Sequence, residues 1–406
     1  MSRPDSSSSV SQGQEPRELE QPLLPGAMLG VLGGGQLGAL FAMAARRMGY
    51  RVTVISDTAD VPAARHADRV EVVDYGNVEQ LAAVAASVDA VTFEFENVPA
   101  EAGRAMAAVT RVHPSPDVLA TTQDRGREKA FLSRHGFATT PYRLITSREE
   151  LFAAAEALGL PGVLKTASCG YDGRGQLRLS DRSQLDAAWE SLGADRLVLE
   201  AWVDFTMELS VVVARGGDAA TASFAPSHNA HARHILDVAS CPAPISEEVA
   251  AQAQDVASRI TAALGLVGVA CVEFFLTRDG RLLVNEIAPR PHNSGHLTIE
   301  AAATSQFEQQ VRAVCGLPLG ATDQMSPAAM ANLLGELWSD GEPDWAAALA
   351  VPGVRLHLYG KASARPGRKM GHLTACYPTV EGAIAAVTEA RRRACRQPLG
   401  VPLTVE

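Results

Sequence analysis

The chain has 406 residues, a formal net charge of −10 and an isoelectric point near 5.5, which argues against a general nucleic-acid binder, since that class is basic. No apolar run reaches the roughly 18 residues that a bilayer span needs, so we expect no membrane partner. The six cysteines are scattered without a close pair, which fits neither a disulfide framework nor a zinc knuckle and favours a reducing, cytoplasmic location.

Residues 1–27 differ from the rest of the chain in composition. They are polar, rich in Ser, Gln, Glu and Pro, and contain no apolar block for a signal peptide. Such a segment buries too little apolar surface to offset the entropy of ordering it. We therefore expect residues 1–27 to form a disordered tail and Met28 to be the functional start.

Strands and helices alternate from Met28 to about residue 120. Apolar runs predict the strands, and apolar residues at helical spacing predict the helices between them. The alternation favours a parallel, doubly wound sheet with helices on both faces. The expected strands are 29–32, 50–56, 70–73, 89–95 and 111–115, and the expected helices are 36–48 and 78–86.

The pattern changes after residue 120. From 121 to 319, strands follow one another with tight turns such as "TRDG", which predicts antiparallel sheet. Residues 320–406 form a third, smaller segment that ends in a helix at about 380–393. The expected fold class is therefore mixed: α/β in the N-terminal domain and α+β in the rest.

The turn "GVLGGGQLG" follows the first strand and opens a helix. Backbone N–H groups at a helix N-terminus are able to hold an anion, so a phosphate or substrate role is one interpretation. An ordinary turn between strand and helix is the other, and the sequence does not decide between them. A dinucleotide site is disfavoured, because Ser56 rather than an acidic residue ends the second strand.

The segment "GYDGRGQ" at 170–176 comes shortly after a strand that ends at Lys165. Its glycines let the backbone approach a ligand without Cβ atoms in the way. Such a loop is able to fold over nucleotide phosphates while Lys165 neutralises their charge. A flexible hairpin between two strands is the alternative.

Acidic and amide side chains stand on two strands further along. "CVEFF" carries Glu273, and "NEIAPRPHNSGH" carries Asn285 and Glu286. Two acids and an amide on neighbouring strands predict an all-oxygen site of the kind that Mg²⁺ prefers. A purely structural polar cluster is less favoured, because unpaired polar groups at a strand end are costly unless a ligand uses them.

Two further segments carry acidic, imidazole or basic groups. Glu200 closes a strand, where its carboxylate is able to accept a hydrogen bond from an adenine amino group or a ribose hydroxyl. His228, His231 and His234 recur every third residue, a spacing that sends neighbours to opposite faces of an extended chain and disfavours zinc. "KASARPGRKMGH" at 361–372 concentrates cations that suit a phosphate, although a solvated basic loop has the same composition.

Together these motifs resemble the ATP-grasp ligases, and among them the N(5)-carboxyaminoimidazole ribonucleotide synthase family of purine biosynthesis. The landmarks are "GGGQLG", "FEFENVP", "QDRGREKAFL", "GYDGRGQ", "NEIAPRPHNSGH" and "RPGRKMGH", in that order from Met28 onward. The resemblance implies a pre-ATP-grasp domain over 28–120, an ATP-grasp domain over 121–319 and a C-terminal domain over 320–406. It also implies a homodimer and ATP-dependent carboxylation of 5-aminoimidazole ribonucleotide with bicarbonate.

The resemblance further implies roles for single residues. The catalytic residues would be Lys165, Arg290, His292 and Asn293, the last three at the bicarbonate site. Magnesium would be bound by Glu273 and Glu286, and aminoimidazole ribonucleotide by Tyr171, Asp172, Lys361 and Arg368. ATP would be bound by Arg125, Lys165, Gly170, Tyr171, Asp172, Gly173, Arg174, Gly175, Gln176, Glu200, Ala201, Trp202, Val203, Glu208, His231, Asn285 and Glu286.

Two alternatives remain at this point. Another ATP-grasp carboxylate–amine ligase, such as the formate-dependent glycinamide ribonucleotide transformylase, shares the magnesium carboxylates, but "GYDGRGQ" and "RPGRKMGH" favour the carboxylating family. A nucleotide-binding protein without ligase activity would keep "GGGQLG". It would have no use for Glu273 and Glu286 together with "RPHNSGH".

Overall fold

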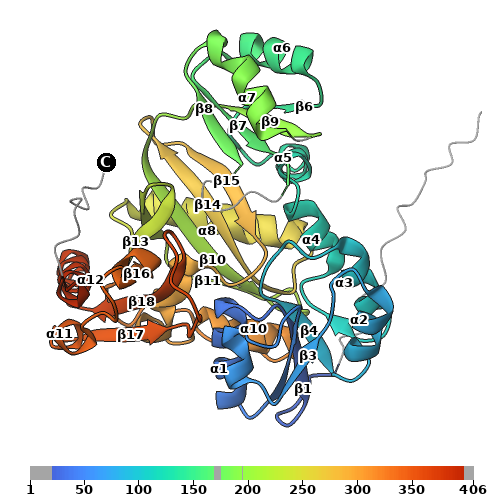
Figure 1. Ribbon diagram of the computed structural model, residues 1–406, viewed down its shortest axis with the longest axis vertical. Coiled ribbons are helices and arrows are strands. Elements are labelled where there is room, and N and C mark those ends of the chain that lie inside the picture. Colours follow the sequence, from blue (N-terminus) through green and yellow to red (C-terminus); the bar gives the residue numbers. More distant parts are fainter. Residues whose placement is uncertain (1–20, 169–174, 194, 397–406) are drawn as a thin grey trace, which may run out of the picture.

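The computed structural model describes residues 21–168, 175–193 and 195–396, and their strands form three sheets (Figure 1). A five-stranded sheet lies at the lower right of the view, a four-stranded sheet lies at the top, and a nine-stranded sheet runs from the centre to the lower left. The expected mixed fold class is confirmed. Within the described ranges, no helix is both long and apolar enough to cross a membrane.

The five-stranded sheet is parallel, as expected. Its strands are β1 (Met28–Leu32), β2 (Arg51–Ser56), β3 (Arg69–Val72), β4 (Ala90–Phe93) and β5 (Arg111–Val112), in the spatial order β3-β2-β1-β4-β5. The helices on it are α1 (Gln36–Arg47), α2 (Val78–Ala85), α3 (Ala100–Ala107) and α10 (Gln306–Val314). Leu29 and Val31 of β1 pack with α1 and α10, whereas Leu32 packs with α2 and α3. Helices therefore cover both faces.

Residues 21–27 are attached to the body through Leu23 and Ala27, although the other residues of this stretch are exposed. This attachment corrects the expected disordered tail for residues 21–27. The N–H of Leu23 donates to the Cys315 carbonyl (2.8 Å), and the Leu23 carbonyl accepts a hydrogen bond from the Tyr50 hydroxyl (2.7 Å). The Leu23 side chain also packs against the core between α1 and the sheet. The polar composition of the tail as a whole concealed this short apolar anchor. Residues 1–20 lie outside the described residues.

The four-stranded sheet is antiparallel and follows two linking helices, α4 (Pro116–Thr122) and α5 (Arg125–Arg134). Its strands are β6 (Tyr142–Ile145), β7 (Gly162–Thr166), β8 (Gln176–Leu179) and β9 (Leu197–Ala201), in the order β6-β9-β7-β8. Helices α6 (Arg148–Leu158) and α7 (Leu185–Leu192) pack on it. In the β7–β8 hairpin, Lys165 pairs with Gln176, and the Thr166 N–H donates to the Gly175 carbonyl (2.8 Å). The hairpin thus fixes both ends of the glycine-rich loop.

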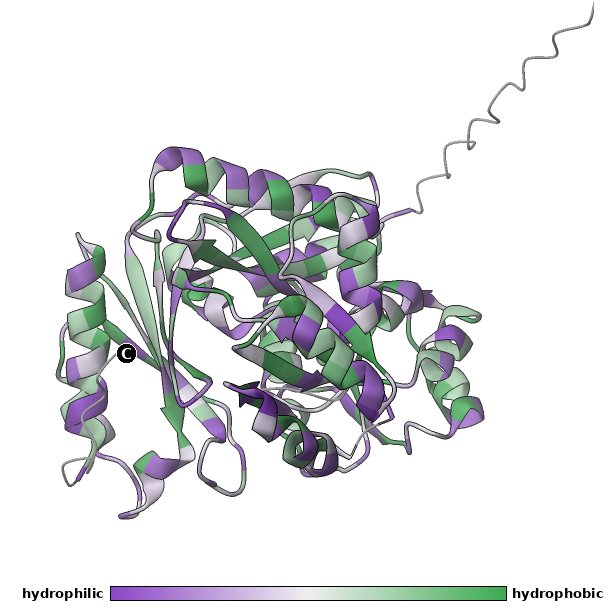
Figure 2. Cartoon of the chain, turned by 90° about the horizontal axis from the view of Figure 1, so that it is seen from above, coloured by the Kyte–Doolittle hydropathy of each residue, from purple (hydrophilic) through white to green (hydrophobic). Residues whose placement is uncertain are grey.

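The nine-stranded sheet is antiparallel and continues into the C-terminal part, because β13 pairs with β16. Its strands are β10 (Phe205–Arg215), β11 (Thr221–Ser223), β12 (Ser227–Ala232), β13 (Ile235–Cys241), β14 (Gly268–Thr277), β15 (Leu282–Ala288), β16 (Ala328–Leu334), β17 (Val354–Leu358) and β18 (Lys369–Cys376). Its spatial order is β15-β14-β10-β12-β13-β16-β18-β17, with β11 beside β10. Helices α8 (Glu247–Ala263) and α12 (Val380–Ala394) bury an apolar side against it, and Figure 2 shows polar residues interspersed along the helices. Two short helices, α9 (Thr298–Ala301) and α11 (Trp345–Leu349), complete this part.

Candidate active site

A buried ion cluster joins the four-stranded sheet to α5. Glu200 on β9 accepts a hydrogen bond from Lys165 on β7 (Nζ–Oε2 2.9 Å) and forms an ion pair with Lys129 on α5 (Nζ–Oε1 3.3 Å). Lys129 also donates to the carbonyl of Asn285 on β15 (3.3 Å), so it ties the four-stranded sheet to the large sheet. All three charged side chains are buried. We call Lys129, Lys165 and Glu200 the Glu200 ion cluster.

A pair of carboxylates stands on the large sheet. Glu273 on β14 and Glu286 on β15 are direct cross-strand partners, and we call them the acid pair. Arg125, at the start of α5, donates to Glu286 (Nη1–Oε2 3.1 Å), and Oε1 of Glu273 lies 3.2 Å from Nε2 of His292. Like charges directly opposite each other repel, so the acid pair needs a cation before both carboxyls can ionise.

Two asparagines in the same segment have buried polar atoms without partners among the described residues. The β14–β15 register shifts between Glu273 and Phe274, and Asn285 is the extra residue at this bulge. Oδ1 of Asn285 and both side-chain polar atoms of Asn293 have no hydrogen-bond partner. Because unpaired buried polar atoms are costly, we expect these amides to serve a ligand.

Arg290 is held by an acid from the N-terminal part. Glu96, shortly after β4, contacts the guanidinium through both carboxylate oxygens, with Nη2–Oε1 at 3.0 Å and a second contact from Nε to Oε2. Burial acts to raise the pKa of Glu96, but the charge of Arg290 holds it below its ordinary value. Burial and the same charge lower the pKa of His292 well below its ordinary value, so this ring is neutral.

The two acidic centres differ in pKa: Glu200 is buried, whereas Glu273 and Glu286 are half-buried. Burial acts to raise the pKa of Glu200, but its two lysines lower it to about 2. Burial and the charge of Glu286 raise the pKa of Glu273 to about 8. Burial also opposes ionisation of Glu286, yet Arg125 and Lys165 hold its pKa below the ordinary value. At neutral pH, Glu273 therefore keeps its proton, whereas Glu200 is ionised.

Glu208 on β10 and His231 on β12 form an ion pair on neighbouring strands of the large sheet. Burial acts to lower the pKa of His231, but its hydrogen bond with Glu208 raises it above the ordinary value. Within the part of the chain that the structure describes, His228, His231 and His234 do not gather into a metal cluster.

The segment after β9 connects the two antiparallel sheets. The N–H of Ala201 donates to the Pro141 carbonyl (2.9 Å) and that of Trp202 to the Pro161 carbonyl (3.1 Å). The Arg178 guanidinium lies over the Trp202 ring, 4.1 Å from its centroid. Ala201 and Trp202 are thus fixed through their backbone where β9 leads into the large sheet.

The cationic loop between β17 and β18 reaches back to the N-terminal part. Lys361 Nζ donates to Oε1 of Gln36 at the start of α1 (2.6 Å) and to the Lys369 carbonyl (2.5 Å). Arg368 Nη1 donates to the carbonyl and the hydroxyl of Ser363 (2.9 and 3.0 Å). The charge of Lys369, at the start of β18, also acts to lower the pKa of Glu273. The start of β18 is therefore close enough to the acid pair for their charges to interact.

The glycine turn before α1 is occupied by a side chain of the protein itself. Glu94, just after β4, accepts hydrogen bonds from the N–H groups of Gly35 and Gly38, the latter at 2.6 Å. Burial raises the pKa of Glu94. A Cβ at Gly33 would lie 2.2 Å from the Glu94 side chain, so this turn admits only glycine there. Because Glu94 already uses these donors, the structure favours the turn interpretation over a phosphate site.

The structure brings most of the predicted site residues into connected contacts, but it leaves part of the glycine-rich loop undescribed. Gly175 has φ +70°, and a Cβ there would lie 2.6 Å from Thr166 Oγ1, so glycine is needed where the loop returns to β8. Gln176 begins β8. Outside the described residues lie Gly170, Tyr171, Asp172, Gly173 and Arg174.

Sequence reasoning missed three ionic groups, of which Lys129 and Glu128 are buried and Glu96 is half-buried. Lys129 and Glu128 lie in "QDRGREKAFL", and the helical spacing of four residues places Lys129 on the face of Arg125. Burial and the charge of Glu286 raise the pKa of Glu128 to about 8. Glu96 lies in "FEFENVP", just beyond the carboxyl end of a parallel strand, where ligand-binding groups of such sheets gather. All three residues lie in motifs that the sequence analysis had already singled out.

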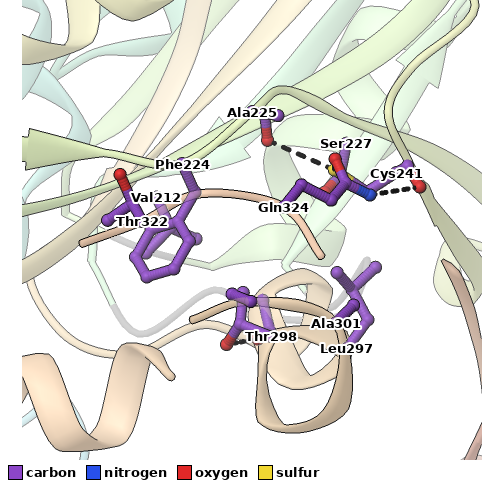
Figure 3. A pocket seen from close by; sticks show the side chains of 12 residues that line it. Val212, Phe224, Ala225, Ser227, Cys241, Leu297, Thr298, Ala301, Thr322 and Gln324 are labelled. Atoms are coloured by element: carbon purple, nitrogen blue, oxygen red, sulfur yellow. Dashed lines mark hydrogen bonds between the residues drawn. The ribbon is translucent and has the colours of Figure 1, made fainter. Parts of the chain in front are cut away.

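Figure 3 shows a small pocket on another part of the large sheet. Phe224, Cys241 and Thr298 are among its mainly apolar lining, and Gln324 Nε2 closes one side by donating to the Cys241 carbonyl (2.7 Å). Neither the acid pair nor any member of the Glu200 ion cluster lines it. The pocket therefore has no part in the candidate active site.

Three family models match the chain in succession. A ribonucleotide synthetase preATP-grasp domain matches residues 27–123, an ATP-grasp domain matches 130–307, and a phosphoribosylaminoimidazole carboxylase C-terminal domain matches 328–386.

Curated and solved relatives agree with these models. An N5-carboxyaminoimidazole ribonucleotide synthase of Brucella melitensis is 45% identical over 88% of this chain and 98% of its own length. The one of Bacillus subtilis is 41% identical over 87% and 93%. A crystal structure of the N5-carboxyaminoimidazole synthase of Aspergillus clavatus with ADP and 5-aminoimidazole ribonucleotide has a TM-score of 0.82 and 31% identity, covering 92% of this chain and 99% of that one.

Proposed function

Because the chain belongs to the N5-carboxyaminoimidazole ribonucleotide synthase family of ATP-grasp ligases, we propose that it carboxylates 5-aminoimidazole ribonucleotide with ATP and bicarbonate. The observation that carries the proposal is the acid pair, which lies between the Glu200 ion cluster and the Glu96–Arg290 contact. This arrangement provides cationic groups on both sides of a metal-binding centre, as a reaction among several anions requires.

The reaction has two steps. A bicarbonate oxygen attacks the γ-phosphorus of ATP, the bond to the β-phosphate oxygen breaks, and carboxyphosphate and ADP result. The exocyclic amine of the ribonucleotide then attacks the carboxyl carbon, phosphate leaves, and the amine proton passes to solvent or a base. The protein needs to position the reactants and neutralise their charge, so its catalysis is mainly electrostatic.

Magnesium fits the acid pair. Both members offer hard oxygen ligands, the buried Asn285 Oδ1 has no partner among the described residues, and Glu273 stays protonated without a cation. Glu273 and Glu286 would hold the ion. When bound, it would neutralise the β- and γ-phosphate charge that develops during transfer.

Lys165 serves the phosphates from the four-stranded sheet, where Glu200 holds its ammonium group. We assign the base and ribose of ATP to Ala201, Trp202, Val203, Glu208 and His231. Arg125 balances Glu286 within the same contact network. The glycine-rich loop 170–176 is assigned to the phosphates, and exclusion of water there would protect carboxyphosphate from hydrolysis.

Bicarbonate is assigned to the run from Arg290 to Asn293. The Glu96 contact fixes the plane of the Arg290 guanidinium, which leaves its remaining N–H groups able to meet an anion. The lowered pKa of His292 keeps its ring neutral, and the Asn293 amide has unused hydrogen-bonding capacity among the described residues. These neutral polar groups beside the Arg290 guanidinium suit a small anion.

The ribonucleotide phosphate is assigned to Lys361 and Arg368, with Tyr171 and Asp172 of the loop completing its site. The Lys361–Gln36 contact supports this assignment, because it sets the cationic loop against the N-terminal part at the start of α1. We also propose a homodimer, which sedimentation equilibrium would test.

ADP release tests the whole proposal. With Mg²⁺ present, the rate is expected to rise sharply only when aminoimidazole ribonucleotide and bicarbonate are both added. Omission of either one provides the control. Faster ADP release with formate and glycinamide ribonucleotide would contradict the choice of reaction.

A further inference from the structure

A cysteine stands beside the acid pair, and the proposed reaction does not use it. Cys271 precedes Glu273 by two residues on β14, so both side chains point to one face of the strand. The Cys271 sulfur, a Glu273 oxygen and a ring nitrogen of His292 all lie within 4.8 Å of one another. Among the described residues, no other group of three His, Cys, Asp or Glu side chains converges in this way. We call these residues the Cys–Glu–His cluster.

The histidine of this cluster is already oriented. Nε2 of His292 lies 3.2 Å from Oε1 of Glu273, while Nδ1 lies 2.8 Å from the Ser294 hydroxyl. The Ser294 oxygen is also 3.9 Å from the Cys271 sulfur and accepts a hydrogen bond from Ser210 (2.7 Å). Nδ1 also accepts a hydrogen bond from the Ser294 N–H (3.3 Å), so the neutral ring carries its proton on Nε2. An ion at Nε2 therefore requires this proton to move to Nδ1, where the Ser294 hydroxyl oxygen would accept it.

The donor set selects a different ion from the one assigned to the acid pair. Magnesium prefers oxygen ligands alone, whereas a thiolate, an imidazole and a carboxylate suit Zn²⁺ and similar thiophilic divalent cations. Tetrahedral zinc ligands of these types stand about 3.3–3.8 Å apart, so small side-chain rotations would bring the cluster to bonding geometry. A water molecule or a substrate oxygen would fill the fourth position.

We propose that the Cys–Glu–His cluster binds Zn²⁺ or a similar thiophilic divalent cation, and that this ion and magnesium exclude each other because both require Glu273. Binding stands on the cluster alone. The exclusion rests on the proposed function, since that function assigns Glu273 to magnesium. Such an ion would inhibit the ligase reversibly by occupying the metal and bicarbonate sites together.

Cobalt provides the first test, because Co²⁺ bound to a thiolate absorbs in the near ultraviolet by sulfur-to-metal charge transfer. The full chain is titrated with Co²⁺ without nucleotide. We expect the absorption in the native chain and in Cys376→Ala, which removes a partly exposed cysteine on β18, and its loss in Cys271→Ala. Persistence in Cys271→Ala, or no absorption in the native chain, would overturn the proposal. Cys271→Ser, which nearly preserves the side-chain volume, must behave like Cys271→Ala, and circular dichroism verifies that each variant is folded.

Competition provides the second test. Zn²⁺ is expected to abolish the cobalt absorption. The Mg²⁺–ADP complex is added at about ten times the dissociation constant with which it binds this chain. We expect it to weaken the apparent Co²⁺ affinity by roughly tenfold. An unchanged Co²⁺ affinity would refute the exclusion. Neither readout requires turnover, so a chain without ligase activity would leave the binding result intact and would fail only in the ADP-release assay.

Discussion

Glu200, which is buried, and Glu273, which is half-buried, are two carboxyls with opposite electrostatic surroundings. Glu200 has two lysines within ion-pairing distance and a pKa of about 2. Glu273 faces another acid and has a pKa of about 8. A carboxylate whose cations come from the chain itself is part of the preformed structure. A carboxylate that lacks such cations needs a ligand to ionise at neutral pH, which is why we assign Glu273, and not Glu200, to the proposed metal site.

Glu286→Gln tests the proposed metal-binding role of the acid pair, and we expect it to have the largest effect. The substitution keeps the shape but removes a charge from the acid pair, and we expect turnover to fall by at least ~100-fold, the scale of losing a well-placed electrostatic group. Steady-state ADP release at saturating substrates measures it. Glu389→Gln, on the exposed side of α12, is the matched control and should keep full activity. Near-normal activity of Glu286→Gln would refute the assignment of the metal.

Glu200→Gln tests how much the Glu200 ion cluster contributes to the free energy of unfolding. The pKa of Glu200 is lowered in the folded state, so its stabilisation is present above the unfolded pKa of about 4.5 and is lost as pH falls toward 2. We expect the free energy of unfolding to drop by roughly 3 kcal/mol at pH 7, because two lysines lose their buried partner. The deficit relative to the native chain should shrink below about pH 4.5. Urea unfolding between pH 3 and 7 measures both quantities.

A double variant sharpens this result. Removing both partners of a buried ion pair costs less than removing one, so Glu200→Gln combined with Lys129→Met should recover part of the lost stability. A double variant that is less stable than Glu200→Gln by the full cost of a second independent change would show that the two side chains are not coupled.

Arg368→Ala tests whether the cationic loop binds the ribonucleotide phosphate independently of the ATP site. A charge-assisted hydrogen bond to phosphate is worth about 1.5–3 kcal/mol, so the Michaelis constant for the ribonucleotide should rise roughly 10- to 100-fold. The Michaelis constant for ATP should change little. Equal increases in both constants would assign this arginine to the nucleotide, and no change in either would leave it a solvated loop residue.

Glu273→Gln should change stability in the opposite direction from Glu200→Gln. The folded-state pKa of Glu273 is raised to about 8, so the charged form penalises folding increasingly as pH rises from about 4.5 through 8. Gln resembles the protonated carboxyl, so we expect Glu273→Gln to be more stable than the native chain at pH 8 without Mg²⁺. Unfolding in urea with a chelator present is the measurement. A loss of stability at pH 8 would mean that Glu273 already has a cationic partner.

The smallest effect on stability is expected from removing the Leu23 anchor, which lies outside the candidate active site. A chain that begins at Met28 loses the two Leu23 backbone hydrogen bonds and the packing of its side chain, so unfolding should become easier by about 1 kcal/mol. A chain that begins at Gln21 keeps these contacts and is the control. Equal melting temperatures of the two would remove the anchor role of Leu23.

Local patterns were sufficient to predict most of the strands and the orientation of the sheets. The strand runs of the N-terminal part end at glycine, serine or proline signals, and the predicted strand at 50–56 became β2 at Arg51–Ser56. Helix α6 was not predicted, although Ser147 and Glu150 mark its start: the Ser147 hydroxyl accepts from the Glu150 N–H. That signal was present in the sequence but was not used.

Long-range ionic pairing was beyond the sequence. Helical spacing places Arg125 and Lys129 on one face of α5, but their acids, Glu286 and Glu200, lie on two different sheets. Similarly, the sequence placed Glu273 beside a metal but did not reveal that Cys271 and His292 converge on it. A spacing rule describes one element, whereas such partners are set by how separate elements meet.

The continuity of the nine-stranded sheet determines which parts of the site are able to move relative to one another. β13 and β16 pair from Val238 with Ala331 to Cys241 with Ala328, so the acid pair and the strand that follows Arg368 belong to one hydrogen-bonded scaffold. The four-stranded sheet has its own core and is attached through α5 and the segment after β9. A hinge there would move the four-stranded sheet with Lys165, whereas the distance between the acid pair and Arg368 would be kept by the large sheet.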